Sequence, residues 1–514
     1  MKRTTRIGVA AAVATLLVVA GVARLAVRPA PVADPVAGGY AEAPCWFDVD
    51  LDRTVVCGAF VIPERWDVDG SRTQRLAIVT FKAARTSDAA APIVFLNGGP
   101  GDRVRVRTDD EIRNWADWLE RETWTHERDF IVLAQRGTNW TDANLACAAL
   151  GDPRLYAGVS EQPGAETDWR TDTKRAYQAC RDRLVAAGHD LAAYSTYQGA
   201  KDVAGLRRAM GIDDWVLYGV SYGTRLALAV MRDHPQGVAA AVLDSVWPPE
   251  VGVGADDAAA FMATLTKIAE ACRADAACNG RYPDVVGAFV SSIERLRRAP
   301  VEIAVPGADG AKTLYVLYDP TLFVDTLYFA MYWWDTVKAI SKAVDGFARS
   351  DFDAFVGLAR DYVDDPQYEA FAHGTAIAVN CNDNLAVDAA VDRDAQAAAY
   401  PYLREWIEDF NDDTFCDGWA LDAARRGTAA ATVSDIPTLL LAGGLDVATP
   451  ADYARMTAAR LSASHLFVFP ATSHDVIDSH QCASDLVAAF LADPAARPAP
   501  GCFDAGESVQ FYGD

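Results

Sequence analysis

Residues 215–223 read Trp-Val-Leu-Tyr-Gly-Val-Ser-Tyr-Gly, and Thr-Arg-Leu-Ala-Leu-Ala-Val-Met follows directly. A short apolar run therefore leads into Gly-x-Ser-x-Gly and then into a helix-forming segment, which predicts strand, sharp turn and helix. Such a turn raises one hydroxyl, that of Ser221, above the end of a sheet. Gly219 and Gly223 suit the turn because a Cβ on either residue would meet neighbouring backbone. We expect Ser221 to be a nucleophile, since a chance match to the pentapeptide rarely has both flanking elements.

Strand and helix patterns alternate along much of the chain. Apolar runs of the strand type lie at residues 92–96, 129–134, 238–244, 438–442 and 465–469, and helical spacing occurs at residues 197–210, 451–461 and 482–491. Strands that alternate with helices form a mostly parallel sheet with helices on both faces, so the predicted fold class is α/β. Residues 55–62 and 76–81, separated by a turn-rich segment, predict an antiparallel pair before this sheet.

The pattern changes in the middle of the chain. Helical segments dominate residues 248–430, with examples at 258–272, 285–298, 320–347 and 352–363. The aromatic residues Tyr328, Phe329, Tyr332, Trp333 and Trp334 cluster there, and we expect them to pack helix on helix rather than line a substrate site. We therefore expect a helical lid insertion at 248–430 between two parts of a sheet domain, 36–247 and 431–514.

The N-terminus and the cysteines both indicate export. A basic head and the apolar run Ile7–Val22 are typical of a signal peptide, so residues 1–35 are expected to be signal and linker. Cleavage after Ala23, cleavage after Ala33 and retention as a membrane anchor stay open. Ten cysteines, an even number, fit an oxidising compartment. Their spacing suggests the pairs Cys45–Cys57, Cys147–Cys180, Cys272–Cys278, Cys381–Cys416 and Cys482–Cys502 without proving them.

Composition limits the classes of partner. Of 514 residues 51% are apolar and 23% are charged, which is ordinary for a globular protein. The formal net charge of −24 disfavours nucleic acid and anionic lipid as partners. No Cys-x-x-Cys pair or histidine cluster occurs, so we expect no metal and no cofactor. The sequence defines no oligomeric state.

Chain order identifies groups that could activate Ser221. A serine hydroxyl needs a base and a carboxylate that orients the base. After a turn of this kind the acid and then the histidine follow the serine. Asp446 and His474 each follow a predicted strand in a loop, where catalytic groups are commonly placed. We predict Ser221, Asp446 and His474 as the catalytic triad. Position argues against the neighbouring candidates His465, His480, Asp435, Asp475 and Asp478.

An oxyanion hole needs backbone N–H groups aimed at the developing charge. We expect one from Tyr222, next to the nucleophile, and another from Gly98 or Gly99 in Asn97-Gly-Gly-Pro-Gly-Asp102. Glycine lets the backbone approach a substrate carbonyl closely.

Together these motifs resemble the α/β-hydrolase peptidases of the proline iminopeptidase and tripeptidyl aminopeptidase type. The similar segments are the turn at Ser221, the loop at 97–101, Gln135-Arg-Gly-Thr138, the acid turn at 444–450, His474 and Cys381-Asn-Asp383. Two residues depart from the family pattern: Asn97 replaces a histidine and Ala134 replaces an aspartate. Neither change touches the predicted triad. Both put the identity of the substrate in doubt more than the type of reaction.

The resemblance implies an α/β-hydrolase fold with a helical lid, and a secreted aminopeptidase that acts through an acyl-enzyme on Ser221. Its substrate is a peptide or small molecule, and Asp383 and Asn97 are candidates for binding it. For Asp383 a structural hydrogen bond beside Cys381 is the alternative role. An esterase or lactone hydrolase would share the triad. A non-catalytic binding protein is disfavoured because the triad is intact.

Overall fold

The computed structural model describes residues 37–85, 90–138, 141–165, 167–307, 312–363, 371–388, 391–410, 416–419, 429–499, 501–509 and 511. The signal peptide and linker predicted for residues 1–35 lie outside these ranges. Within them, no helix combines the length and the apolar character that crossing a membrane requires.

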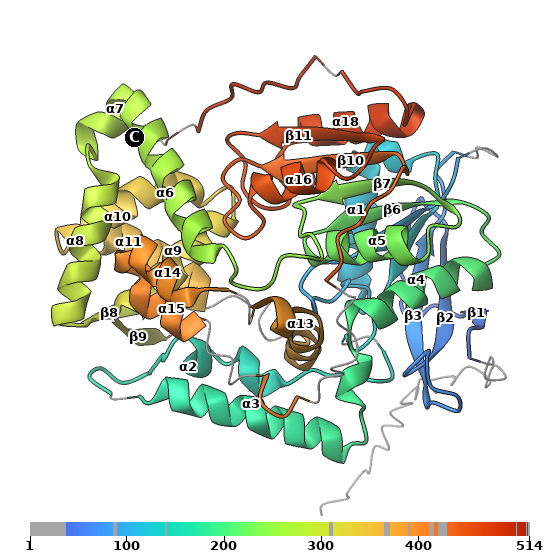
Figure 1. Ribbon diagram of the computed structural model, residues 1–514, viewed down its shortest axis with the longest axis horizontal. Coiled ribbons are helices and arrows are strands. Elements are labelled where there is room, and N and C mark those ends of the chain that lie inside the picture. Colours follow the sequence, from blue (N-terminus) through green and yellow to red (C-terminus); the bar gives the residue numbers. More distant parts are fainter. Residues whose placement is uncertain are drawn as a thin grey trace, which may run out of the picture. The chain divides into compact units, whose positions relative to one another are not determined.

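One sheet of nine strands, in the order β1-β2-β3-β5-β4-β6-β7-β10-β11, organises the described chain (Figure 1). The strands are β1 (Tyr40–Ala43), β2 (Val55–Pro63), β3 (Thr73–Phe81), β4 (Ile93–Leu96), β5 (Phe130–Leu133), β6 (Trp215–Val220), β7 (Val238–Asp244), β10 (Thr438–Gly443) and β11 (Ser464–Phe469). The strands from β5 to β11 in this order are parallel, and β1, β2 and β3 pair antiparallel at one edge. The predicted mostly parallel sheet and the antiparallel pair are both confirmed.

Helices cover both faces of the sheet. Helices α4 (Thr196–Ala209), α5 (Tyr222–Asp233) and α16 (Ala451–Ala458) share one apolar core with it. Helices α1 (Asp109–Arg121) and α18 (Gln481–Ala492) share a second core on the other face. Every residue of β4, β5, β6 and β10 is buried. Strands covered on both faces are apolar without alternation, which explains the continuous runs in the sequence.

The segment between β7 and β10 is mostly helical and has an apolar core of its own. Its elements are α6 (Asp257–Ala274), α7 (Ala276–Arg281), α8 (Val285–Arg298), β8 (Val301–Pro306), β9 (Thr313–Tyr318), α9 (Pro320–Tyr332), α10 (Ile340–Ala348), α11 (Asp353–Val363), α13 (His373–Asp388), α14 (Arg393–Ala399) and α15 (Arg404–Phe410). In Figure 1 most of these helices gather in a group beside the sheet.

One element of this segment was not predicted, and one predicted helix needs correction. The antiparallel hairpin of β8 and β9 was not predicted, although Ile303 and Val305 alternate with exposed residues as a half-buried strand should. The helix expected over 320–347 is broken between α9 and α10. Trp333 leaves the helical conformation, and the hydroxyl of Thr336 donates to its carbonyl oxygen at 3.1 Å. Such side-chain bonds to backbone compete with helix continuation.

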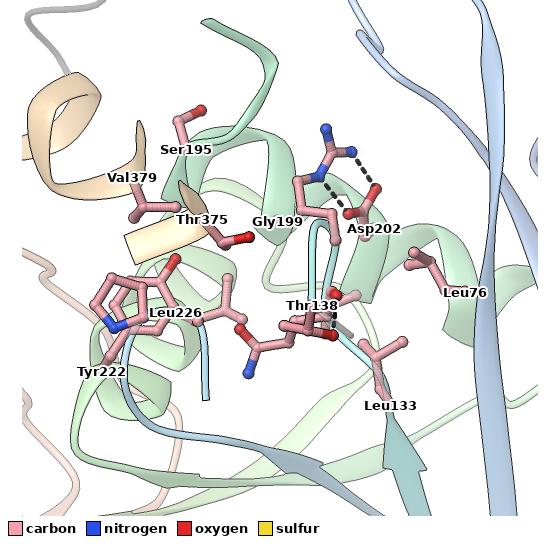
Figure 2. A pocket seen from close by; sticks show the side chains of 15 residues that line it. Leu76, Leu133, Thr138, Ser195, Gly199, Asp202, Tyr222, Leu226, Thr375 and Val379 are labelled. Atoms are coloured by element: carbon pink, nitrogen blue, oxygen red, sulfur yellow. Dashed lines mark hydrogen bonds and ion pairs between the residues drawn. The ribbon is translucent and has the colours of Figure 1, made fainter. Parts of the chain in front are cut away.

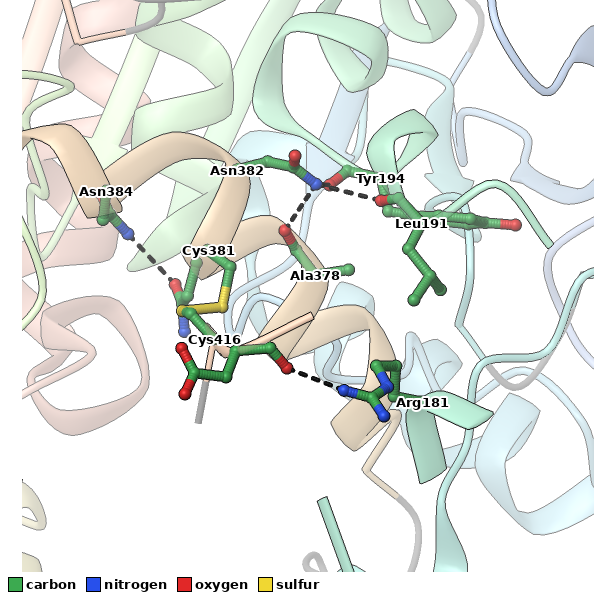
Figure 3. The surroundings of a disulfide bond; sticks show 10 residues. Arg181, Leu191, Tyr194, Ala378, Cys381, Asn382, Asn384 and Cys416 are labelled. Carbon is green, nitrogen blue, oxygen red and sulfur yellow. Dashed lines mark hydrogen bonds between the residues drawn. A yellow bond between two sulfur atoms is a disulfide. The ribbon is translucent and has the colours of Figure 1, made fainter. Parts of the chain in front are cut away.

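All five predicted disulfides are present. The surroundings of Cys381–Cys416 show how one is anchored (Figure 3). The Asn382 side chain donates to the carbonyl oxygens of Leu191 and Tyr194, both at 3.0 Å. This fixes α13 against the chain that leads into α4.

Candidate active site

Ser221 occupies the turn between β6 and α5 with φ 55° and ψ −124°, an unusual conformation for a residue with a side chain. Both flanking glycines are required by close backbone approach. A Cβ on Gly219 would lie 2.5 Å from the carbonyl oxygen of Gly223, and a Cβ on Gly223 would overlap the carbonyl oxygen of Leu96. The predicted strand, turn and helix are therefore present, with the strained residue at the serine.

His474 and Asp446 form a buried pair, with Nδ1 of the histidine 2.8 Å from Oδ2 of the carboxylate. The other carboxylate oxygen accepts the backbone N–H groups of Ala448 at 2.9 Å and Thr449 at 2.8 Å. The Thr449 hydroxyl donates to Oδ2 at 2.6 Å. With its oxygens satisfied in this way, Asp446 can hold the imidazole in one orientation. Thr449 belongs to the acid turn noted in the sequence, but its role there was not foreseen.

Ser221 and His474 line the same cavity, whose volume is about 1070 Å³. His474 Nε2 is buried and has no hydrogen-bond partner among the described residues. The Tyr332 side chain, which comes from α9, lies next to that of Ser221. Catalytic hydrogen bonds often form only when substrate is bound. The geometry thus brings the three predicted triad residues to one site, with the bond from serine to histidine not yet made.

Tyr332 also contacts the base directly. Its ring lies 4.2 Å from that of His474, centroid to centroid, and its carbonyl oxygen accepts the His474 backbone N–H at 3.2 Å. Tyr328, Phe329 and Trp333 line the cavity as well, and Tyr328 and Phe329 also pack against the helical core. The expectation that this aromatic cluster serves only helix packing is therefore wrong. Its position on a helix predicted for the lid was the available signal.

Asp244, the last residue of β7, connects Ser221 with the loop that follows His474. Its carbonyl oxygen accepts the Ser221 N–H at 3.0 Å. Its carboxylate accepts the N–H groups of Val476 at 3.0 Å and Ile477 at 2.8 Å, just after His474. Burial raises the pKa of Asp244 to about 6, against these hydrogen bonds. Apart from an acid at the end of a predicted strand, no local pattern indicates this role.

The predicted oxyanion-hole residues lie beside the nucleophile. A Cβ on Gly98 would be 3.3 Å from that of Ser221, and both Gly98 and Gly99 line the cavity. Tyr222 is the first residue of α5, where backbone N–H groups have no acceptor within the helix. Its side chain points away, and its hydroxyl lies 3.0 Å from that of Thr196.

The Gln135-Arg-Gly-Thr138 segment contacts the loop at 97–101, which holds Gly98 and Gly99. Gln135 donates to the carbonyl oxygen of Asn97 at 2.9 Å. Arg136 is buried and forms a two-bond ion pair with Asp202 at 2.6 and 2.7 Å, drawn as dashed lines to Asp202 in Figure 2. A planar guanidinium matches a carboxylate in this two-bonded way. Residues 135–138 thus have a structural role next to the loop at 97–101.

The two candidate substrate residues differ in their surroundings. Asn97 lines the cavity close to Asp102. Asp383 is buried outside the cavity lining, and its oxygens lie 3.0 and 3.3 Å from the N–H of Thr196 at the start of α4. A carboxylate at this place satisfies a helix N-terminus. This geometry favours the structural alternative for Asp383.

Comparisons with known proteins agree with this geometry. The family description "alpha/beta hydrolase fold" matches residues 91–275, and "TAP-like protein" matches residues 403–501. Serine protease Hip1 of Mycobacterium tuberculosis is 25% identical over 515 residues, which cover 94% of each chain. Tripeptidyl aminopeptidase of Streptomyces lividans is 24% identical over 364 residues, 66% of this chain and 62% of that protein.

Two solved structures are also similar. Proline iminopeptidase of Mycobacterium smegmatis has 14% identity and a TM-score of 0.35, over 85% of this chain and 98% of that chain. An esterase of Thermogutta terrifontis has 14% identity and a TM-score of 0.34, over 86% and 99%.

Proposed function

We propose that this chain, which belongs to the α/β-hydrolase serine peptidases of the proline iminopeptidase and tripeptidyl aminopeptidase type, is a secreted aminopeptidase. It releases N-terminal residues or tripeptides from peptides through an acyl-enzyme on Ser221. The observation that carries the proposal is the meeting of Ser221 with the His474–Asp446 pair at one large cavity. The five disulfides are typical of an exported protein.

The proposed reaction is acyl transfer. Ser221 Oγ attacks the scissile carbonyl carbon while His474 Nε2 takes the hydroxyl proton, and Asp446 stabilises the resulting imidazolium. The N–H groups of Tyr222 and of Gly98 or Gly99 receive the oxyanion. The intermediate expels the amine, which takes the proton from His474. Water then attacks the acyl-enzyme with His474 again as base, releasing the product acid and restoring the serine.

The helical segment 248–430 is proposed as the lid over this reaction. It contributes Tyr332, which contacts both Ser221 and His474. Ligand pockets for small molecules commonly measure about 300–1,000 Å³. A cavity of about 1070 Å³ is therefore large enough for several residues of a peptide, which supports release of short peptides.

An aminopeptidase must also recognise a free α-ammonium group. Because Asp383 is engaged with Thr196, we assign this role to a lid carboxylate that lines the cavity. Asp409 is already in an ion pair, because its Oδ2 lies 2.6 Å from Nε of Arg170. That leaves Asp325 on α9, which accepts a hydrogen bond from the Trp406 indole at 2.7 Å.

The test compares tripeptidyl aminomethylcoumarin amides with free and with acetylated N-termini, alongside short-chain esters. We expect rapid cleavage of the free peptides, at least about tenfold slower cleavage after acetylation, and no cleavage by Ser221→Ala. Asp325→Asn should remove the preference for the free amine. Equal cleavage of free and blocked peptides would refute the aminopeptidase assignment, and turnover of esters alone would make the protein an esterase.

A further inference from the structure

We propose that the end of the cavity beside His474 is a subsite for a cationic side chain, that of arginine or lysine, recognised by Asp475 and Asp478. The inference rests on the proposed peptidase function and adds a specificity to it. Asp475 directly follows the predicted base, so the residue recognised is one that flanks the scissile bond.

Asp475 is held in place with an unsatisfied carboxylate oxygen. It has φ 59°, and its N–H donates to the Ser245 hydroxyl at 2.9 Å, which fixes the backbone. Oδ1 of its carboxylate is buried and has no hydrogen-bond partner among the described residues. A buried acceptor without a donor is costly. Because Asp475 lines the substrate cavity, a substrate can supply the missing donor.

Aromatic rings form the wall next to these carboxylates. Trp118 and Tyr218 lie parallel, 6.3 Å apart with an interplanar angle of 3°, and both line the cavity. The Trp118 indole donates to Asp478 Oδ1 at 2.7 Å. Trp115 and Phe95 continue the wall. An aromatic wall that ends in carboxylates suits a side chain with an apolar stem and a cationic head.

The protein's own cations do not fill this role. Within the described part of the chain, the salt bridges include neither Asp475 nor Asp478. Cavity-lining Arg170 pairs with Asp409 and Asp319, and Arg103 lies 3.4 Å from Glu111. The carboxyl groups of Asp475 and Asp478 are therefore available to a ligand.

Protonation of Asp475 should make the preference for a cationic substrate depend on pH. Burial, and after it the negative charge of Asp478, raise the pKa of Asp475 well above its usual range. The titratable groups that face it are Asp478, Asp244, Asp446, His474, Tyr218 and Tyr332. A bound cation favours the ionised carboxylate and lowers this pKa, so cation binding releases a proton. Preference for a cationic substrate should therefore grow as pH rises and fade as pH falls.

The main test uses peptides with arginine or citrulline on one or the other side of the scissile bond, since citrulline keeps the shape and removes the charge. We expect wild-type kcat/KM to favour arginine about 10-fold or more at one of the two positions. Asp475→Asn and Asp478→Asn should bring the ratio towards one. Asp117→Asn, an exposed acid of α1 next to Trp118, is the matched control and should keep the wild-type ratio. A wild-type ratio of one at both positions overturns the inference.

A second measurement does not depend on peptide cleavage. Butylguanidinium should slow fluorophosphonate labelling of Ser221 more than the same concentration of butylurea, and Asp475→Asn should abolish the difference. If peptides are not cleaved but this protection persists, the aminopeptidase proposal fails and the subsite stands. If kcat/KM depends on a free N-terminal amine but is the same for arginine and citrulline peptides, the subsite is refuted.

Discussion

The carbonyl oxygen of Asp244 accepts the N–H of Ser221 at 3.0 Å, while the carboxylate of the same residue holds the loop that follows His474. One buried residue thus sets the distance between the nucleophile and the base. Triad activity depends on that distance, because a displacement of about 1 Å can cost on the order of 100-fold in rate. Asp244 is a positioning residue in this arrangement, since it does not touch the reacting atoms.

Replacing Asp244 with asparagine tests whether its two carboxylate oxygens position the loop after His474. Both carboxylate oxygens accept backbone N–H groups, so an amide would turn one acceptor into a second donor facing a donor. We expect Asp244→Asn to lower kcat by about 10-fold or more and the free energy of unfolding by about 1–3 kcal/mol. Steady-state kinetics and urea unfolding measure the two effects. Asp435→Asn, an exposed acid before β10, is the control. Unchanged kcat in a stably folded Asp244→Asn enzyme would refute the positioning role.

Thr449 offers a test of the acid turn. Its hydroxyl donates to Asp446 Oδ2 at 2.6 Å and lies 3.2 Å from His474 Nδ1. Thr449→Val keeps the shape and the backbone N–H but removes this donor, so Asp446 should hold the imidazole less firmly. We expect kcat/KM to fall by about 10-fold, with recovery in Thr449→Ser. Thr457→Val removes a buried hydroxyl on α16 and should not change turnover. Equal rates in the valine and serine variants would contradict the assignment.

The Tyr332 side chain lies next to Ser221 and against the ring of His474, whose Nε2 has no hydrogen-bond partner among the described residues. A hydrogen bond between the Tyr332 and Ser221 hydroxyls would compete with the bond from Ser221 to His474, and a neutral hydrogen bond contributes about 0.5–1.5 kcal/mol. Tyr332→Phe keeps the ring on His474, so we expect fluorophosphonate to label Ser221 about 2- to 10-fold faster. Tyr318→Phe removes a buried hydroxyl in the helical core and serves as control. A tenfold slower reaction in Tyr332→Phe would instead make the hydroxyl a donor to the transition state.

The limits of prediction from sequence follow from the kind of interaction involved. The turn at Ser221, the buried strands and the five disulfides depend on local composition or spacing, and these predictions were confirmed. The hydrogen bonds of Asp244 to Val476 and Ile477 join segments more than 200 residues apart, and no local pattern encodes them. The contact of Tyr332 with His474 also joins distant segments. It lies at the end of α9, where the helix stops before Trp333. Asp383 resembled a family motif, yet its partner is a helix N-terminus that only the fold brings close.

Buried acids of the lid should make stability depend on pH in an unusual direction. Burial raises the pKa of Asp325 to about 7 and that of Asp257 to about 7, whereas an unfolded aspartate titrates near about 3.9. Between roughly pH 4 and pH 7 the folded chain holds protons that the unfolded chain has released, so stability rises as pH falls through this window and is lost as pH rises. We expect the unfolding midpoint in urea to increase from about pH 8 to about pH 5.5.

Asp325→Asn isolates one of these groups. The amide oxygen can still accept the Trp406 indole N–H, but the side chain no longer takes up a proton. We expect the variant to be more stable than wild type at about pH 8 and to show a smaller increase on acidification. Asp110→Asn, an exposed acid on α1, should keep the wild-type slope. Parallel pH profiles for Asp325→Asn and wild type would show that Asp325 stays ionised in the folded protein, with Arg170 as the nearby cation that holds its charge.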